Sequence, residues 1–492
     1  MLNFVKNKMI NIFPKNRFAR SVSVLAGGTV AGQIIAVAAS PILTRLYSPE
    51  HFGLLAVYSS LLTLLGVIVT LRYHLAIPLP QEEQEAKSLV IISLIFSFVT
   101  ALLVSLGVWF FSEKLALLLN TPSLASYAFL LPVGMILLGI YQTLSYWSIR
   151  KKKYKDISKT KFTQAGSMAL IQISGSSFGP IALILGQIVG QAAGAAKLAK
   201  GLIQHHSNHK MSIRLTFFIA LKNHWRFPLF STWGGLFNAA SSNAPLILFP
   251  ALFSPAIAGY YFLAQRIMLT PIRLVGLSVA QVFYGSLEER IRENNLSDVV
   301  IKTHKVLVMV SLAPALLLLA GGQEIFTIFF GKDFAQAGYF AQLLAPWMYF
   351  ELTTAPIKKT LTAVNHQFIE SLWEISVFSF RVASIIIGAF LESVEIAIVL
   401  LSLFSSIHYA VLLYIVNYLT SSRLQVIYWQ KTTFFFKLSF GTSLLAVLAC
   451  HSTVVKNGDV IIGFFGITIA LFLISLRELK VNMEKIRTND EY

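Results

Sequence analysis

Fourteen apolar runs of about twenty residues fill this 492-residue sequence, and charged or turn-forming residues bound each run. A helix needs roughly 20 apolar residues to cross the hydrocarbon core of a bilayer. Charged residues make up 13% of the chain, against roughly 25% in soluble domains. The sequence therefore predicts an all-α, polytopic integral membrane protein with about 14 transmembrane helices. The predicted spans are residues 20–43, 53–77, 87–111, 125–147, 158–178, 180–202, 227–252, 257–283, 302–322, 336–361, 369–391, 393–418, 433–451 and 459–476.

The basic residues predict the orientation of these spans. With the N-terminus in the cytoplasm, 32 of the 40 lysines and arginines fall in cytoplasmic segments, four fall outside and four lie within spans. An excess of Lys and Arg in short cytoplasmic loops is the positive-inside rule. Most of the net charge of +18 thus reflects topology rather than nucleic-acid binding. Both termini are predicted to be cytoplasmic, and the basic run Arg150–Lys153 is interpreted as a stop signal rather than a lipid-recognition site.

Several kinds of chemistry are excluded by residues that the sequence lacks. Cys450 is the only cysteine, so an intramolecular disulfide, an iron–sulfur cluster and a thiolate zinc site are ruled out. There is no GxxxxGK[ST] motif for ATP and no Asp-x-Asp pair for metal-dependent sugar transfer. The predicted loops are too short for a catalytic domain. We expect neither an enzyme nor a bound cofactor, so secondary transport or flipping remains.

An internal repeat relates the two halves of the predicted bundle. Three loop markers recur at an offset of 206 residues, each at the same place in the order of spans. Six spans followed by six more predict two lobes related by an axis along the membrane normal, with a site between them near the midplane. That is the architecture of a transporter. The markers are Ser48, Pro49 and Gly53 with Ser254, Pro255 and Gly259, and Glu82 and Glu83 with Glu288 and Glu289.

The repeat predicts the organisation of the whole chain. Two six-helix lobes are joined by a cytoplasmic loop, and two extra helices follow the second lobe. The predicted boundaries are 1–19 for a cytoplasmic N-terminal segment, 20–205 for the N-terminal lobe, 206–226 for the connecting loop, 227–420 for the C-terminal lobe, 421–476 for the last two spans and 477–492 for a cytoplasmic tail.

Four arginines are predicted to lie within spans: Arg72 in the second, Arg266 and Arg273 in the eighth and Arg381 in the eleventh. Each would cost about 2.5–3.5 kcal/mol at a lipid-facing helix centre, so we expect them to face protein or water. Arg266 and Arg273 share one helical stripe, and Pro271 between them is a candidate hinge. The second and eighth spans contain no acidic residue. A cationic central cavity for an anionic substrate is therefore predicted.

Two carboxylates inside the C-terminal lobe leave an alternative open. Glu351 and Glu374 are candidates for coupling transport to H⁺ or Na⁺, but each could instead pair with a buried cation, and for Glu351 the pairing is the favoured interpretation. Glu374 shares a helical stripe with Arg381, and Lys358 shares one with Glu351. Arg72 lies toward the cytoplasmic end of its span and could extend its charge into the interface. No metal ligand set is predicted.

Two segments carry a family resemblance. They are PILTRLYSPEHFG, from Pro41 to Gly53, and WSIRKKKYKDISKTKF, from Trp147 to Phe162. With the length, the six-plus-six repeat and the positive charge, the sequence resembles Wzx-type oligosaccharide flippases. These belong to the polysaccharide-transporter branch of the multidrug/oligosaccharidyl-lipid/polysaccharide (MOP) exporter superfamily, which also holds lipid II flippases and multidrug extruders.

The resemblance implies a function for the predicted cavity. It implies that an undecaprenyl-diphosphate-linked oligosaccharide moves from the cytoplasmic to the periplasmic leaflet of a bacterial inner membrane, for O-antigen, capsule or exopolysaccharide synthesis. Arg72, Arg266 and Arg273 match the basic residues that family members use in the second and eighth spans. A polymerase and a chain-length regulator are candidate protein partners. The alternative is a cation-coupled exporter of small molecules, which the absence of an acidic residue from the first span disfavours.

Overall fold

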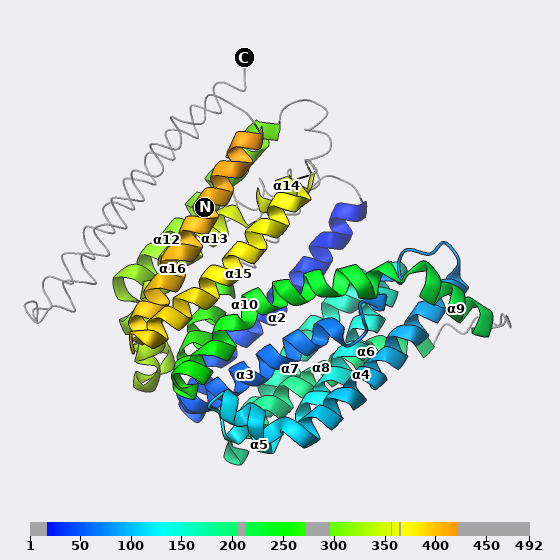
Figure 1. The fold of residues 1–492 in the computed structure, drawn as a ribbon, viewed down its shortest axis with the longest axis horizontal. Coiled ribbons are helices and arrows are strands. Elements are labelled where there is room, and N and C mark those ends of the chain that lie inside the picture. Colours follow the sequence, from blue (N-terminus) through cyan, green and yellow to red (C-terminus); the bar gives the residue numbers. More distant parts are fainter. Residues whose placement is uncertain (1–16, 204–212, 271–295, 356, 364–365, 421–492) are drawn as a thin grey trace, which may run out of the picture.

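The fold was examined in a computed structural model that describes residues 17–203, 213–270, 296–355, 357–363 and 366–420. This part of the chain is built from α-helices, with short 3-10 and π-helical turns, and holds no strand (Figure 1). Eight of the helices are long and apolar enough to cross a membrane. The prediction of an all-α polytopic membrane protein is confirmed. The last two predicted spans, 433–451 and 459–476, lie outside the described residues.

The N-terminal lobe is built from helices that pack side by side. Among them α2 packs on α7, α7 on α8, α8 on α6 and α6 on α4. The described elements of this lobe are α2 (Arg17–Leu46), α3 (Pro49–Ile68), η1 (Tyr73–Ala76), α4 (Glu83–Leu118), α5 (Ser123–Tyr127), α6 (Leu130–Arg150), α7 (Tyr154–Ser174), η2 (Ser176–Phe178) and α8 (Ile181–Ile203). The helix α9 (Ile213–Asn223) follows in the connecting segment.

The C-terminal lobe repeats this arrangement. Here α12 packs on α13, α13 on α16, α16 on α15 and α15 on α10. Its described elements are η3 (Phe227–Ser231), α10 (Thr232–Leu252), a helix over residues 255–270, α12 (Leu296–Phe330), η4 (Lys332–Phe334), α13 (Ala335–Thr354), η5 (Ile357–Lys359), α14 (Thr360–Ala363), α15 (Gln367–Phe390) and α16 (Val394–Thr420).

The two lobes meet through the repeated Ser-Pro segments. A Cβ on Gly53 would lie 1.9 Å from the carbonyl oxygen of Pro255, and a Cβ on Gly259 would lie 2.0 Å from that of Pro49. Each copy of the motif therefore packs its glycine on the proline of the other copy. Side chains larger than hydrogen would separate the backbones, so these two glycines allow α3 and the 255–270 helix to cross closely. We call this the Ser-Pro end of the molecule.

Further contacts between the lobes lie at the same end. Asn120 donates a hydrogen bond to the carbonyl of Phe253, at 3.3 Å, and Arg45 donates one to the carbonyl of Phe329, at 3.3 Å. In Figure 1, α15 and α16 are inclined to α4 and α6, and the two groups of helices approach each other toward this end. The opposite end carries the loops near Pro80, Lys152 and His224, and we call it the basic end.

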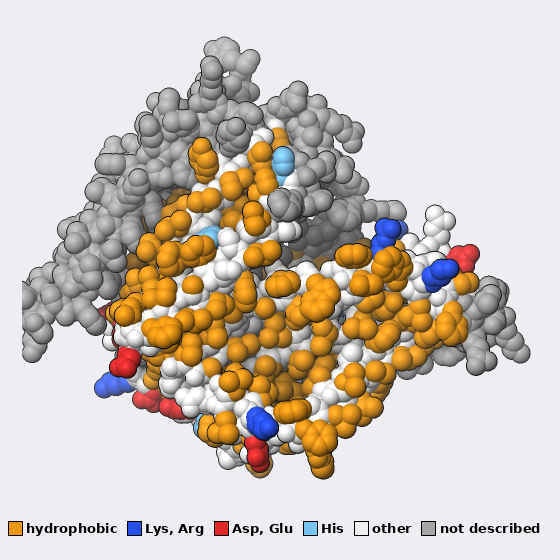
Figure 2. Space-filling model, in the orientation of Figure 1, with side chains coloured by type: hydrophobic (Ala, Val, Ile, Leu, Met, Phe, Trp, Pro, Cys, Tyr) orange, Lys and Arg blue, Asp and Glu red, His pale blue; other side chains and the backbone are white. Residues whose placement is uncertain are grey.

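One face of the molecule is apolar between the two ends. Figure 2 shows hydrophobic side chains across the middle of the molecule, with charged side chains gathered near its ends. Trp109 and Phe110 on α4 are 82% and 70% exposed, and Phe178 is 75% exposed. A soluble monomer rarely exposes a continuous apolar area of this kind, whereas lipid tails would cover it. The surface thus agrees with a membrane-spanning bundle.

Several predicted boundaries are corrected by the structure. The second predicted span, 53–77, is not one helix, because α3 ends at Ile68 and a turn separates it from η1. The ninth, 302–322, lies within a longer helix, α12, whose backbone departs from helical geometry at Gly321. The connecting loop contains α9, which apolar-run analysis does not detect since this helix has only eleven residues.

Candidate functional site

A cavity of about 320 Å³ lies where α2, α3, α7 and α8 of the N-terminal lobe face the 255–270 helix of the C-terminal lobe. Five helices from both lobes therefore form its wall. Its volume is at the lower end of the roughly 300–1,000 Å³ typical of small-molecule sites. The lining residues are Gln33, Ala36, Leu55, Ser59, Met168, Gln172, Gln187, Phe262, Gln265, Arg266 and Leu269.

Arg266 provides the only charge among these lining residues. It lies eleven residues beyond Pro255, which is about 16 Å along a helix axis. This depth is close to the middle of a hydrocarbon core about 30 Å thick. Its Nη2 donates a hydrogen bond to the carbonyl oxygen of Ala36 on α2, at 3.0 Å. One backbone carbonyl does not neutralise a guanidinium, so the cavity keeps a net positive charge.

Four glutamines surround this charge with neutral amide groups. Gln187 accepts a hydrogen bond from the hydroxyl of Ser59, at 3.0 Å. Gln172 is 1% exposed and donates from Nε2 to the carbonyl of Leu183, at 2.9 Å. The Oε1 of Gln172 has no hydrogen-bond partner among the described residues. Sequence reasoning missed this amide wall, because glutamines spread over four helices show no pattern along the chain.

Arg72 lies away from the cavity, toward the basic end. It follows α3, a helix of 20 residues and therefore about 30 Å long. Leu71 and Arg72 have φ angles of 46° and 63°, a left-handed conformation that costs about 1–2 kcal/mol per non-glycine residue. The Arg72 guanidinium lies against α10, since a Cβ on Gly235 would be 1.6 Å from its Nη2. Arg72 therefore links the end of α3 to the first helix of the other lobe.

Arg381 lies inside the C-terminal lobe and has polar and aromatic neighbours. It is 9% exposed. Its Nη1 donates to the carbonyl of Ser241 on α10, at 3.2 Å. Its guanidinium carbon lies 5.1 Å from the centre of the Trp347 ring, a cation–π contact. The same interior holds Glu351, whose carboxylate accepts a hydrogen bond from Tyr409.

The buried lysine and glutamates pair differently from the sequence expectation. The sequence left open a pairing of Lys358 with Glu351 and of Glu374 with Arg381 as the alternative to ion coupling. Instead, Lys358 on η5 forms ion pairs with Glu374 and, at 3.8 Å, with Glu370, both on α15. Its Nζ also lies 4.4 Å from the centre of the Trp373 ring. The turn between α13 and η5 carries Lys358 toward α15, and helical periodicity within one span cannot anticipate that turn.

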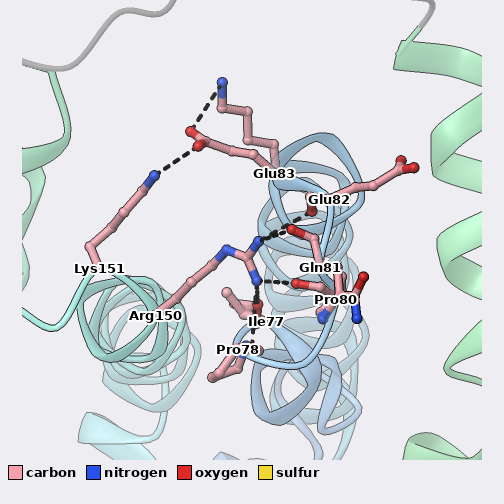
Figure 3. Close-up of polar contacts among 9 residues, drawn as sticks. Ile77, Pro78, Pro80, Gln81, Glu82, Glu83, Arg150 and Lys151 are labelled. Atoms are coloured by element: carbon pink, nitrogen blue, oxygen red, sulfur yellow. Dashed lines mark hydrogen bonds and ion pairs between the residues drawn. The ribbon is translucent and has the colours of Figure 1, made fainter.

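The basic run after α6 has a structural role. Figure 3 shows the Arg150 side chain directed into the loop between η1 and α4. Its guanidinium donates to backbone carbonyls of this loop, of which that of Pro80 is nearest, at 2.5 Å. Lys151 forms an ion pair with Glu83 at 3.0 Å. The remaining carbonyls bonded by Arg150 are those of Ile77, Pro78, Gln81 and Glu82.

The structure thus separates the arginines that the sequence grouped together. Arg266 lines the cavity, Arg72 lies at the basic end and Arg381 lies within the C-terminal lobe. Arg273 and the candidate hinge Pro271 lie outside the described residues.

Comparison with known proteins identifies the family and the fold. A sequence-family profile described as "Polysaccharide biosynthesis protein" matches residues 42–338, more than half of the chain. No curated protein matches the sequence. Among solved structures, the lipid II flippase MurJ in an inward closed conformation superposes with a TM-score of 0.72 at 14% identity, covering 93% of this chain and 99% of MurJ.

Two other solved structures share the fold. A MOP superfamily transporter from Pyrococcus furiosus has a TM-score of 0.58 at 12% identity, covering 81% of this chain and 95% of its own. An inward-facing multidrug resistance transporter of the MATE family has a TM-score of 0.54 at 12% identity, covering 84% and 95%. All three solved structures are of flippases or transporters. The chain is a multi-pass membrane protein that belongs to the polysaccharide biosynthesis protein family and has the fold of MOP superfamily transporters.

Proposed function

We propose that this protein is a flippase that moves an undecaprenyl-diphosphate-linked oligosaccharide from the cytoplasmic to the periplasmic leaflet of a bacterial inner membrane. Its product would enter O-antigen, capsule or exopolysaccharide synthesis. One observation carries the proposal: Arg266 faces a cavity between the lobes whose lining contains no carboxylate. A guanidinium is well suited to bidentate contact with phosphate oxygens, and at mid-membrane depth its charge requires compensation. The diphosphate of the substrate would supply it.

The two lobes would give alternating access to this cavity. The close crossing of Gly53 with Pro255 and of Gly259 with Pro49 joins the lobes at the Ser-Pro end. We place that end on the periplasmic side, because the basic loops at the other end follow the positive-inside rule. Opening the Ser-Pro end while the basic end closes would expose the cavity to the opposite leaflet.

The cavity also bears on the alternative function. A cation-coupled exporter of cationic drugs would bind its substrate near a carboxylate, and an apolar drug would favour a mainly apolar wall. Here the lining carries one arginine, four glutamines and a serine. That composition favours an anionic, hydroxyl-rich substrate.

The Arg266→Ala variant tests the proposal in a cell that depends on this protein for its surface polysaccharide. We expect surface polymer to be lost while the lipid-linked oligosaccharide accumulates inside and the amount of membrane-inserted protein is unchanged. Lys114→Ala is the matched control, since Lys114 is an exposed cation on α4 and its loss should leave the polymer intact. Undiminished polymer in the Arg266→Ala strain would contradict the proposed function.

A further inference from the structure

The segment that joins the two lobes is strongly basic. Between Lys197 and Arg226 the sequence holds six lysines and arginines and no aspartate or glutamate. In the other basic run, Arg150 and Lys151 are already bonded within the protein. Lys222 and Arg226 are exposed, and neither side chain has a hydrogen-bond or ion-pair partner among the residues that the structure describes. The basic end therefore presents two cations that no described carboxylate compensates.

One side of α9 fixes this segment to the start of α4. Ala220 is buried in a cluster that includes Leu89 of α4. At the end of α9, Asn223 and the following His224 contact the Oε1 of Glu85 at 3.0 and 3.2 Å. Glu85 lies just before the apolar run with which α4 crosses the membrane. The end of α9 is thereby held at the level of the lipid headgroups.

The opposite side of α9 is exposed and combines aromatic rings with the two cations. Phe218 and Lys222 are four residues apart, so they are neighbours on the helix surface. Trp225 and Arg226 follow directly, and the exposed ring of Trp225 lies 6.2 Å from that of Phe230, which is also exposed. We call these five residues the α9 surface. It offers apolar area and positive charge side by side.

Lipid is the occupant that this surface fits. Trp233 and Phe237, exposed on α10, continue the aromatic residues toward the middle of the molecule, where lipid tails cover the apolar face. Tryptophan favours the headgroup level of a bilayer, and basic amphipathic helices bury their apolar side chains there while their cations attract anionic lipids. A zwitterionic headgroup would leave two positive charges without net compensation, whereas an anionic headgroup supplies it.

We infer that the α9 surface binds an anionic phospholipid of the leaflet at the basic end. Lys222 and Arg226 contact the phosphate region of this lipid, and the rings of Phe218 and Trp225 lie beside the upper part of its acyl chains. The surface is separate from the cavity that Arg266 lines. The inference thus goes beyond the proposed function, and either one can fail without the other.

The helix α7 provides a matched control for the two cations. Lys155 and Lys159 are also exposed, lie four residues apart on a helix and belong to the basic end. However, α7 packs on α2 and α8, whereas α9 packs on α4. Replacing either pair with glutamine removes two positive charges, so the two double variants differ mainly in where the charges are lost.

The test measures how strongly brominated lipid quenches the fluorescence of Trp225 in the full-length protein in nanodiscs. Every nanodisc contains the same mixture of phosphatidylcholine and phosphatidylglycerol. In one set the phosphatidylglycerol carries the bromine, and in the other an equal mole fraction of phosphatidylcholine carries it. Subtracting the signal of the Trp225→Phe variant isolates the contribution of Trp225.

A cation at a membrane surface favours anionic lipid by about fivefold, so we expect phosphatidylglycerol to quench Trp225 about threefold more strongly than phosphatidylcholine. The double variant Lys222→Gln, Arg226→Gln should bring the two lipids close to equal quenching. The control Lys155→Gln, Lys159→Gln should keep the preference of the wild type.

Three results would overturn the site. They are equal quenching by the two lipids in the wild type, an unchanged preference in Lys222→Gln, Arg226→Gln, and an equal loss of preference in the α7 control, which would show that overall charge attracts the lipid. Displacement of phosphatidylglycerol from Trp225 by a much smaller amount of undecaprenyl diphosphate would reassign the surface to the lipid-linked substrate.

A second measurement does not need the tryptophan variant to fold. Native mass spectrometry counts the phosphatidylglycerol molecules that the wild type and Lys222→Gln, Arg226→Gln retain after release from nanodiscs. We expect the double variant to retain fewer, because both substituted side chains are exposed and only their charge is lost. Equal retention would contradict the inference.

Discussion

The central cavity and the interior of the C-terminal lobe both bury a guanidinium, yet they surround it differently. Arg381 lies among a backbone carbonyl, the Trp347 ring and the nearby Glu351, and Lys358 is paired with two glutamates. Arg266 donates a hydrogen bond to one backbone carbonyl and faces a cavity lined by glutamine amides. The ion pairs of Lys358 and the cation–π contact of Arg381 fit a role in holding helices together, although the Nε of Arg381 has no hydrogen-bond partner among the described residues. A charge that faces an open, carboxylate-free cavity fits a role in binding an anion.

Replacing Arg266 with glutamine should give the largest effect on transport. A hydrogen bond to a charged group contributes about 1.5–3 kcal/mol, so we expect flipping of the lipid-linked oligosaccharide by reconstituted protein to fall by roughly 100-fold. The unfolding temperature should stay the same or rise, because the variant no longer buries an uncompensated charge. Arg266→Lys keeps the charge and should retain part of the activity. A marked loss of stability in Arg266→Gln would show that Arg266, like Arg381, holds helices together, and it would contradict the proposed difference between the two regions.

The same substitution at Arg381 should have the opposite outcome. Arg381→Gln removes the bond to the Ser241 carbonyl and the contact with Trp347, so we expect the free energy of unfolding to fall by about 1.5–3 kcal/mol. Flipping per molecule of folded protein should change by less than about threefold, under 1 kcal/mol. Thermal unfolding of the purified protein measures the change in stability, and a flipping assay normalised to the amount of folded protein measures the change in activity. A selective loss of flipping would place Arg381 in the substrate path.

The glycine crossing offers a way to disturb the cavity wall without touching its chemistry. Gly53→Ala places a methyl group against the Pro255 carbonyl, and such overpacking costs about 1–3 kcal/mol. We expect the lobes to separate at the Ser-Pro end, which spin labels on exposed sites of the two lobes would detect as a longer distance. Gly107→Ala on α4 is the control, because nothing lies within 4 Å of its added Cβ. An unchanged distance in Gly53→Ala would show that this crossing does not hold the end closed.

The smallest effect is expected at Glu374. Its partner Lys358 also contacts Glu370 and Trp373, so Glu374→Gln should lower the free energy of unfolding by only about 1 kcal/mol or less. The dependence of flipping on pH and on Na⁺ should stay as in the wild type. A lost dependence on either cation would instead support Glu374 as a coupling residue, which is the alternative left open by the sequence.

Helix positions were the most predictable part of this protein. The break predicted at Gly179 and Pro180 lies between α7 and α8, and Gly179 takes a positive φ of 71° there. Apolar length and turn residues are properties of a single stretch of chain, so they can be read without knowing the neighbours. The prediction of the second span was wrong over its last third, because the left-handed turn at Leu71 and Arg72 is not marked in the sequence by a residue such as glycine.

The candidate site was predictable only in part. Arg266 stood out because a charge inside an apolar run is rare. The glutamines did not, since an uncharged polar residue within a span is common and gives no sign of which way it faces. The partners of Lys358 were also not predictable, because they lie on α15, across a turn from Lys358.

Composition and the order of apolar runs were sufficient to establish a polytopic helical membrane protein, because transfer of each helix into lipid depends on its own residues. Packing between distant segments assigned the roles of the buried charges. Arg266 meets a carbonyl 230 residues away and Arg381 meets one 140 residues away. Whether a buried guanidinium is compensated depends on the helices that surround it in space, and the chain order alone does not specify that neighbourhood.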